Sequence, residues 1–367
     1  MKRILFGLTL IAFFLAGAST FFGVDAQIKS DGASRERQTT AAPTPTPSST
    51  PVLLKEDNEV YTVETELVNI NVRVVDRNSR PISGLKQSDF QVLEENTPQR
   101  IEFFSKSEVP TNYSLVIDNS GSLRSQIEQV IEASKILVAN NRPADETSII
   151  RFVSSDKIEI LQEFTPNKTD LNDALDNLFI EGGQTAIVDA VYLAASRVSE
   201  YEKNTDKIDR KRRALILVSD GEDVNSYYSQ QQLFDLLKET DVQIYVVGFV
   251  NDLPKDGGFI TKSKQSKAKS FLEKLAAETG GRSYFPNAVS ELNNIAKDIA
   301  DELRVQYSIG YIPSNDKEDG TFRNIKVNVA DGPNNQKRIA ITKAGRTADG
   351  SRGAASAAKP ATAPKIQ

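Results

Sequence analysis

Residues 114–122 read Ser-Leu-Val-Ile-Asp-Asn-Ser-Gly-Ser, and this stretch decides the fold. Its apolar half is typical of a short strand that is covered on both faces. The strand ends directly in Asp118, and Ser120 and Ser122 follow at alternate positions. Because Gly121 lets the backbone turn tightly, the three oxygen-bearing side chains can converge on one point.

The chain around this stretch alternates short apolar runs with helical stretches from residue 113 to residue 303. This alternation predicts βαβ units and an α/β fold with a doubly wound, mostly parallel, Rossmann-like sheet. We expect strands at 114–117, 148–152, 214–218 and 243–248, with a short antiparallel edge at 158–161. We expect helices at about 123–140, 169–178, 187–200, 229–239, 268–279 and 289–303.

Two later loops carry oxygen side chains in comparable places. Thr185 follows paired glycines and opens the helix expected at 187–200, and Asp220 follows the strand expected at 214–218. The carboxyl ends of parallel strands meet at one edge of such a sheet, so both loops should lie beside Asp118. Hydroxyl and carboxylate oxygens are hard donors that suit Mg²⁺, Mn²⁺ or Ca²⁺.

Segments with a β pattern stand on either side of the α/β region. Val68, Ile70 and Val72 alternate with polar residues in segment 58–108, and a similar alternation returns in segment 304–343. Together the two segments offer roughly seven strands, the number in a small immunoglobulin-like sandwich. We therefore expect one sandwich with the α/β domain inserted into it; two separate β modules are the alternative.

The ends of the chain predict export. Residues 1–26 combine Lys2 and Arg3 with an apolar stretch and small residues, as a cleaved signal peptide does. An uncleaved membrane anchor is the alternative, because no charge interrupts residues 4–24. Residues 27–57 are a Pro/Thr/Ser-rich linker and residues 344–367 are expected to be a disordered tail. The bulk of the protein should be periplasmic, in the cell envelope or secreted.

Composition excludes several kinds of chemistry. The chain has no Cys and no His, which excludes disulfides, cysteine nucleophiles and Ser-His-Asp catalysis. Catalysis by a carboxylate, lysine or metal stays open. The formal net charge of -5 gives no reason to expect a nucleic-acid partner.

Three features of the chain together resemble the metal-ion-dependent adhesion site of von Willebrand factor type A domains. They are Asp-x-Ser-x-Ser, a Thr after paired glycines, and Ser-Asp-Gly after a later strand. The resemblance covers about residues 111–303, within a domain placed at 109–303. It implies a divalent cation, with Mg²⁺ favoured over Mn²⁺ or Ca²⁺. The implied metal residues are Asp118, Ser120, Ser122, Thr185 and Asp220.

The resemblance also implies how the cation acts. The hydroxyls of Ser120, Ser122 and Thr185 would coordinate it directly, and the two aspartates directly or through water. An Asp or Glu from a protein or cell-surface ligand would complete the coordination. The family pattern further implies that the final helix, 289–303, shifts when the ligand binds.

The wider chain resembles bacterial secreted proteins with an acidobacterial-type domain related to von Willebrand factor A. Gly84-Leu85 with Asp89-Phe90 fits the N-terminal part, and Gly310-Tyr311 fits the C-terminal part. One departure is Arg346, which stands where an aromatic residue is expected after a glycine. The resulting hypothesis is an exported, metal-dependent protein-binding or adhesion module that is not an enzyme. The alternatives are an envelope scaffold with a fold-stabilising ion and a metal-dependent hydrolase.

Overall fold

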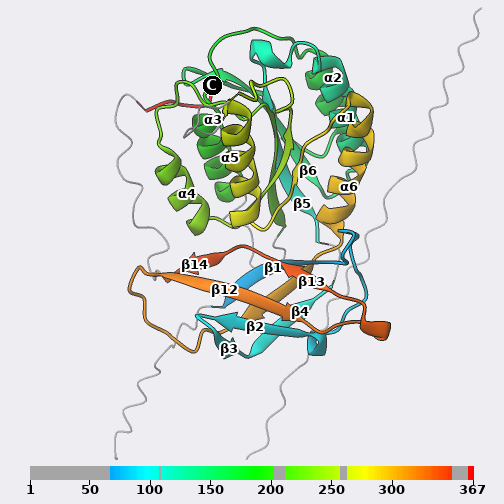
Figure 1. Ribbon diagram of the computed structural model, residues 1–367, viewed down its shortest axis with the longest axis vertical. Helices are drawn as coiled ribbons and strands as arrows, with labels where there is room; N and C mark the ends of the chain where they lie inside the picture. The colour runs from blue at the N-terminus through cyan, green and yellow to red at the C-terminus, as the bar shows by residue number, and fades with distance from the viewer. Residues whose placement is uncertain (1–66, 107–108, 202–210, 257–262, 349–362) are drawn as a thin grey trace, which may run out of the picture. The chain divides into compact units, whose positions relative to one another are not determined.

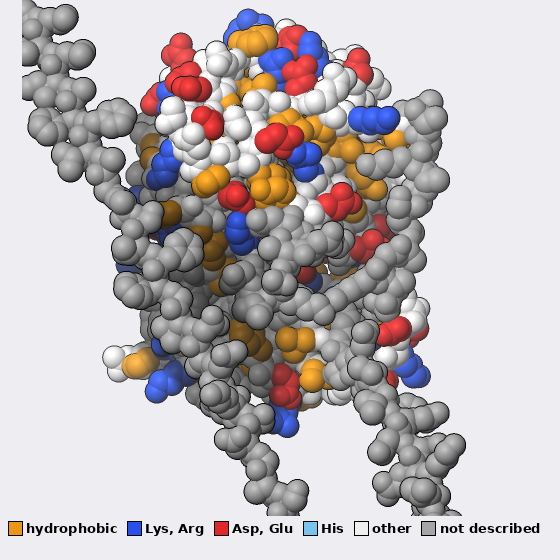
Figure 2. All heavy atoms as spheres, turned by 180° about the vertical axis from the view of Figure 1, so that it is seen from behind, with side chains coloured by type: hydrophobic (Ala, Val, Ile, Leu, Met, Phe, Trp, Pro, Cys, Tyr) orange, Lys and Arg blue, Asp and Glu red, His pale blue; other side chains and the backbone are white. Residues whose placement is uncertain are grey.

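The computed structural model describes residues 67–106, 109–201, 211–256, 263–348 and 363–367. All of them belong to one compact unit, Val63–Gln367. The predicted signal peptide or anchor (1–26) and the linker (27–57) lie outside the described residues. None of the helices in the described ranges is long and apolar enough to cross a membrane. Acidic and basic side chains are interspersed on the face in Figure 2, in keeping with the small net charge.

A six-stranded sheet forms the centre of the α/β domain, in the order β10-β9-β8-β5-β6-β7. Neighbouring strands are parallel except β6 and β7, which are antiparallel. This confirms the predicted mostly parallel sheet. The strands are β5 (Thr111–Asp118), β6 (Glu146–Ser154), β7 (Lys157–Thr165), β8 (Arg212–Ser219), β9 (Val242–Gly248) and β10 (Ser283–Tyr284).

Helices cover both faces of this sheet (Figure 1). Val116 packs into the core on the side of α3, α4 and α5, and Leu115 and Ile117 pack into the core on the side of α1, α2 and α6. Burial of alternate residues on opposite faces explains why the central strands read as continuous apolar runs. The helices are α1 (Ile127–Ala139), α2 (Lys168–Asp176), α3 (Ile187–Glu200), α4 (Gln230–Glu239), α5 (Lys264–Glu278) and α6 (Leu292–Arg304).

Three helices begin three or four residues away from the predicted start. Helix α6 was expected from 289, but Val289–Glu291 form a 3₁₀ turn and α6 starts at Leu292. Helix α1 was expected from about residue 123, but residues Gly121–Leu123 form a 3₁₀ turn and α1 starts at Ile127. Helix α5 was expected from 268 and starts four residues earlier. The hydroxyl of Ser263 accepts a hydrogen bond from the Ser266 N–H and caps its first turn.

The N- and C-terminal β segments pack as one unit with two antiparallel sheets, β13-β1-β11-β4 and β14-β12-β2-β3. Each sheet mixes strands from both segments, and Ile70, Val92, Ile309 and Val327 share one buried core. This excludes two separate β modules. The strands are β1 (Val68–Val75), β2 (Phe90–Glu94), β3 (Thr97–Gln99), β4 (Ile101–Ser105), β11 (Tyr307–Tyr311), β12 (Phe322–Val329), β13 (Ile339–Ile341) and β14 (Gly345–Thr347).

Strand β14 corrects the expectation that the chain is disordered from residue 344. Arg346, the departure from the expected aromatic, lies buried in this strand, and its Nε donates to the buried carboxylate of Glu94 at 3.0 Å. The hydroxyl of Tyr311 donates to the same carboxylate at 2.6 Å. A buried ion pair inside the sandwich therefore stands where the family pattern expects an aromatic residue. Residues 363–367 are also ordered against the α/β domain.

A buried charge cluster joins the sandwich to helix α6. Arg73 of β1 forms an ion pair with Glu302 of α6, and both side chains are 2% exposed. Arg282 donates to the other oxygen of Glu302 at 2.6 Å, and Arg73 donates to the carbonyl of Gly281 at 3.1 Å. One carboxylate thus forms ion pairs with two arginines at the junction.

Replacing Glu302 with Ala should lower the free energy of unfolding by about 3–5 kcal/mol, because Arg73 stays buried without its counter-charge. Asp301→Ala is the matched control on the next residue of α6. Asp301 is half-exposed, so its loss should cost less than about 0.5 kcal/mol. Urea denaturation followed by circular dichroism gives both values; equal effects from the two variants would contradict a buried role for Glu302.

Candidate metal site

The first loop of the candidate site follows β5. The carboxylate of Asp118 is fixed from two sides: one oxygen accepts from the Ser120 N–H at 2.9 Å, and the other from the Ser219 hydroxyl at 2.7 Å. The hydroxyls of Ser120 and Ser122 lie 2.8 Å apart. The 3₁₀ turn after Ser120 therefore brings two hydroxyls together beside a buried carboxylate.

The third loop, after β8, meets the first loop directly. The side chain of Ser122 contacts the carboxylate of Asp220, which also accepts from the Glu222 N–H at 2.9 Å. Gly221 has a φ of +80°, and a Cβ there would lie 2.7 Å from the Leu272 side chain. Glycine is therefore required at this turn for its conformation and for space.

The second loop, which contains Gly182 and Thr185 and precedes α3, is held against the other two loops by its backbone. The carbonyl of Asn119 accepts from the N–H groups of Glu181 and Gly182, at 3.2 and 3.3 Å. The carbonyl of Thr185 accepts from the Val224 N–H at 2.9 Å. Thr185 is buried between the loops, but among the described residues no hydrogen bond links its hydroxyl to the other four predicted metal residues. The structure thus joins Asp118, Ser120, Ser122 and Asp220 by side-chain contacts, and Thr185 by backbone contacts.

Two buried carboxylates give the site its electrostatic character. Burial, and to a smaller extent the nearby charge of Asp220, raise the pKa of Asp118 to about 6 against the opposing hydrogen bonds from Ser120 and Ser219. Burial also raises the pKa of Asp220. Within the described ranges neither carboxylate has an ion pair with a Lys or Arg. The site therefore holds negative charge that no Lys or Arg of the described residues neutralises through an ion pair.

In the described part of the chain, Lys264 acts on Asp220 without forming an ion pair with it. Its ammonium group lies 2.9 Å from the carboxylate of Glu222. Its charge also lowers the pKa of Asp220, but this is the smallest of the effects on that pKa. The donor set suits a hard divalent cation, because two carboxylates and two hydroxyls are already directed at one another. Among the described residues, no group of three or more acidic side chains that could hold a metal ion is found.

Asp189 lies outside this donor set and fixes the neighbouring backbone. It is fully buried, and its carboxylate accepts from the N–H groups of Tyr227 and Tyr228 at 2.7 and 2.8 Å. The hydroxyl of Ser155 donates to the same carboxylate. Asp189 thus lies in the first turn of α3 and fixes the backbone at Tyr227 and Tyr228.

Sequence analysis missed the role of Ser219. Its hydroxyl donates to Asp118 and accepts from the Gly221 N–H at 3.0 Å, so it links the first and third loops. The sequence feature that could have indicated this role is a serine at the last position of the strand that precedes Asp220.

Comparison with known proteins identifies the family. The family model for the von Willebrand factor type A domain matches residues 114–298, half of the chain. The chain therefore belongs to the von Willebrand factor type A family, whose domains typically mediate protein binding. No curated protein matches the chain.

Several solved structures are similar to part of the chain. An aerotolerance-related membrane protein from Bacteroides fragilis is 19% identical, with a TM-score of 0.39, over 53% of this chain and 98% of that chain. Proximal thread matrix protein 1 from the mussel byssus, with a zinc-occupied MIDAS motif, is 18% identical, with a TM-score of 0.42, over 54% of this chain and 48% of that chain. The pilus adhesin SpaC from Lactobacillus rhamnosus GG is 11% identical, with a TM-score of 0.41, over 72% of this chain and 44% of that chain.

Replacing Asp118 with Asn should stabilise the protein in EDTA at pH 7.5 by about 1–3 kcal/mol, because it removes an unneutralised buried charge. The folded-state pKa of Asp118 is raised to about 6, so wild-type stability falls as the pH rises towards 6. The gain from Asp118→Asn should therefore shrink at pH 5. Urea denaturation at the two pH values measures it.

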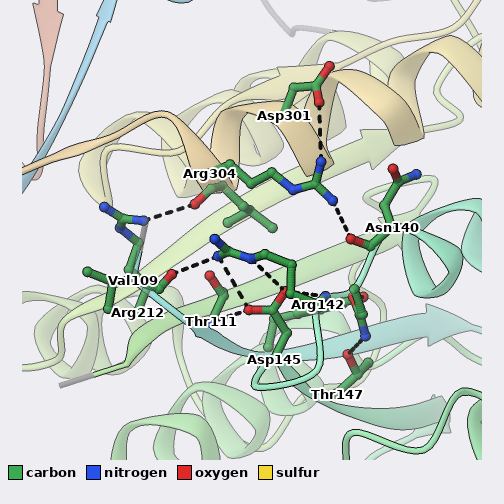
Figure 3. Close-up of polar contacts among 12 residues, drawn as sticks. Val109, Thr111, Asn140, Arg142, Asp145, Thr147, Arg212, Asp301 and Arg304 are labelled. Carbon is green, nitrogen blue, oxygen red and sulfur yellow. Dashed lines mark hydrogen bonds and ion pairs between the residues drawn. The ribbon is translucent and has the colours of Figure 1, made fainter. Parts of the chain in front are cut away.

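Asp145→Asn is the control, because the carboxylate of Asp145 is buried but neutralised. It accepts from the Thr111 N–H at 2.8 Å and pairs with the Arg142 guanidinium at 3.4 Å (Figure 3). This substitution should destabilise the protein. If both substitutions changed the free energy of unfolding in the same direction, the charge argument would be contradicted.

Proposed function

We propose that Asp118, Ser120, Ser122, Thr185 and Asp220 hold one divalent cation, Mg²⁺ before Mn²⁺ or Ca²⁺. The observation that carries this proposal is the pair of buried aspartates beside two serine hydroxyls, without a Lys or Arg to neutralise them in the described structure. A divalent cation would supply the missing positive charge. The hydroxyls of Ser120, Ser122 and Thr185 would be direct ligands.

We further propose that the protein uses this cation to bind a carboxylate of a protein or cell-surface ligand. A cation held mostly by neutral hydroxyls keeps much of its charge, so it can attract an Asp or Glu of a partner. Ser122 and Glu222 are on the solvent side of the site, since Ser122 is exposed and Glu222 is half-buried. Membership of a family that typically mediates protein binding supports this function over catalysis.

Export is the third part of the proposal. The charged start and the apolar stretch of residues 1–26 support it, and would place the binding domain in the periplasm, in the cell envelope or outside the cell. Association with the membrane would then require that this segment is not cleaved.

Replacing Ser122 with Ala should weaken Mg²⁺ binding by about 10-fold to 100-fold, because it removes an oxygen donor beside Asp220. Ser125→Ala is the matched control: Ser125 is also an exposed serine, three residues further along the chain, and its loss should change the affinity less than about 2-fold. Isothermal titration calorimetry measures both. Equal affinities for the two variants would remove Ser122 from the site.

Partner capture should depend on the cation and on partner carboxylates. The wild-type chain and Ser125→Ala should crosslink to the same envelope protein of the source organism, and EDTA or Asp118→Ala should abolish the product. Converting the carboxylates of the envelope fraction to amides should abolish it too, because the cation then lacks its ligand.

The same experiment separates the alternatives. Capture that survives EDTA and Asp118→Ala, while the melting temperature of the variant falls, would support an envelope scaffold with a fold-stabilising ion. Mg²⁺-dependent turnover of a phosphoester or peptide panel would support a hydrolase.

A further inference from the structure

Residues 363–367, which we call the edge segment, lie along the outer strand of the large sheet. The Gln367 N–H donates to the carbonyl of Ile158 at 2.8 Å, and the Ile160 N–H donates to the carbonyl of Gln367 at 2.9 Å. Gln367 thus bonds to the residues immediately before and after Glu159. This is the hydrogen-bond pattern of two parallel strands. The Gln367 side chain adds a third bond, to the carbonyl of Asp156 at 3.0 Å.

Side chains of the edge segment enter the core next to β7. Ala363 is 8% exposed and belongs to the core cluster under α3, α4 and α5. Ile366 is half-buried and packs against the same cluster, whereas Lys365 is exposed. Backbone bonds to an edge strand, together with apolar side-chain contacts, are the features of peptide recognition by strand addition.

The place of β7 in the sheet makes this recognition available to other chains. It is the last strand in the order of the sheet, so a strand from another chain can pair with it once the chain's own edge segment leaves. In Figure 1 the edge segment is drawn in red beside the label C, next to the α/β domain. Between described residues, its backbone bonds are to Ile158 and Ile160 of β7, and its side-chain bond is from Gln367 to Asp156 in the turn before β7. None of these bonds depends on which chain supplies the segment.

We propose that the edge of β7 is a docking site for an extended segment, and that residues 363–367 of a second copy of this chain occupy it. Within one chain the covalent connection through residues 349–362 gives the edge segment a high effective concentration. Where copies are crowded, for example on a surface, the edge segments of neighbouring copies compete for the same edge. Exchange of a short segment between copies then links them at low energetic cost.

Two variants that complement each other test the exchange. Ile366→Ser removes the apolar anchor of the edge segment and leaves β7 intact, so this chain is an acceptor. Ile160→Pro removes the N–H that binds Gln367 and leaves the edge segment intact, so this chain is a donor. Proline is tolerated where the N–H of an edge strand faces away from the sheet.

Sedimentation velocity should show each variant alone as a monomer and their equimolar mixture as a heterodimer, with a dissociation constant between about 10 μM and 1 mM. Adding Ile366→Ser to the donor should weaken association by at least about 10-fold, because the donor loses its apolar anchor. Adding Lys365→Ser, which changes an exposed residue, should leave it unchanged. A mixture that associates no more than its components overturns the proposal.

A labelled synthetic peptide of residues 360–367 replaces the donor if Ile160→Pro does not fold. It should bind the Ile366→Ser chain at least about 10-fold more tightly than the wild-type chain, whose own edge segment competes. It should also restore hydrogen-exchange protection of the Ile160 amide. Equal binding to both chains, or no binding to the Ile366→Ser chain, overturns the proposal.

Discussion

The cost of burying two carboxylates side by side is the constraint on which the candidate site depends. Asp118 is fully buried at the end of β5, and Asp220 is nearly so at the end of β8. An isolated buried carboxylate is normally neutralised by a proton or by a partner charge. Here burial raises the pKa of both groups, and hydroxyls rather than lysines or arginines surround them. The apolar cores on both faces of the sheet must offset this cost whenever no cation is bound.

The three loops are held by contacts that do not involve a cation. Ser219 links Asp118 to the turn at Gly221, and the carbonyl of Asn119 holds the loop before Thr185. Asp189 fixes the backbone that follows the third loop. Since these bonds are made by backbone groups and buried side chains, the donor atoms are positioned before a cation arrives. Such positioning lowers the entropy that binding has to overcome.

The sequence predicted the features that depend on local pattern. The buried strand before Asp118 and the order of strands and helices follow from periodicity, so the sheet and the grouping of the three loops could be predicted. The bond from Ser219 to Asp118 joins residues 101 positions apart and depends on the register of β5 against β8, which no local pattern encodes. The pairing of Arg346 with Glu94 and the docking of Ile366 depend on tertiary contacts in the same way.

The junction with the sandwich bears on the shift of the final helix that the family resemblance implies. Glu302 lies in the last turn of α6 and accepts hydrogen bonds from Arg73 in the sandwich and from Arg282. Breaking a buried ion pair costs about 3–5 kcal/mol, whereas coupling between two binding sites is typically about 1–3 kcal/mol. A ligand at the loops therefore cannot separate α6 from β1 by coupling energy of that size. Any movement of α6 has to carry the sandwich with it or be confined to its N-terminal turns.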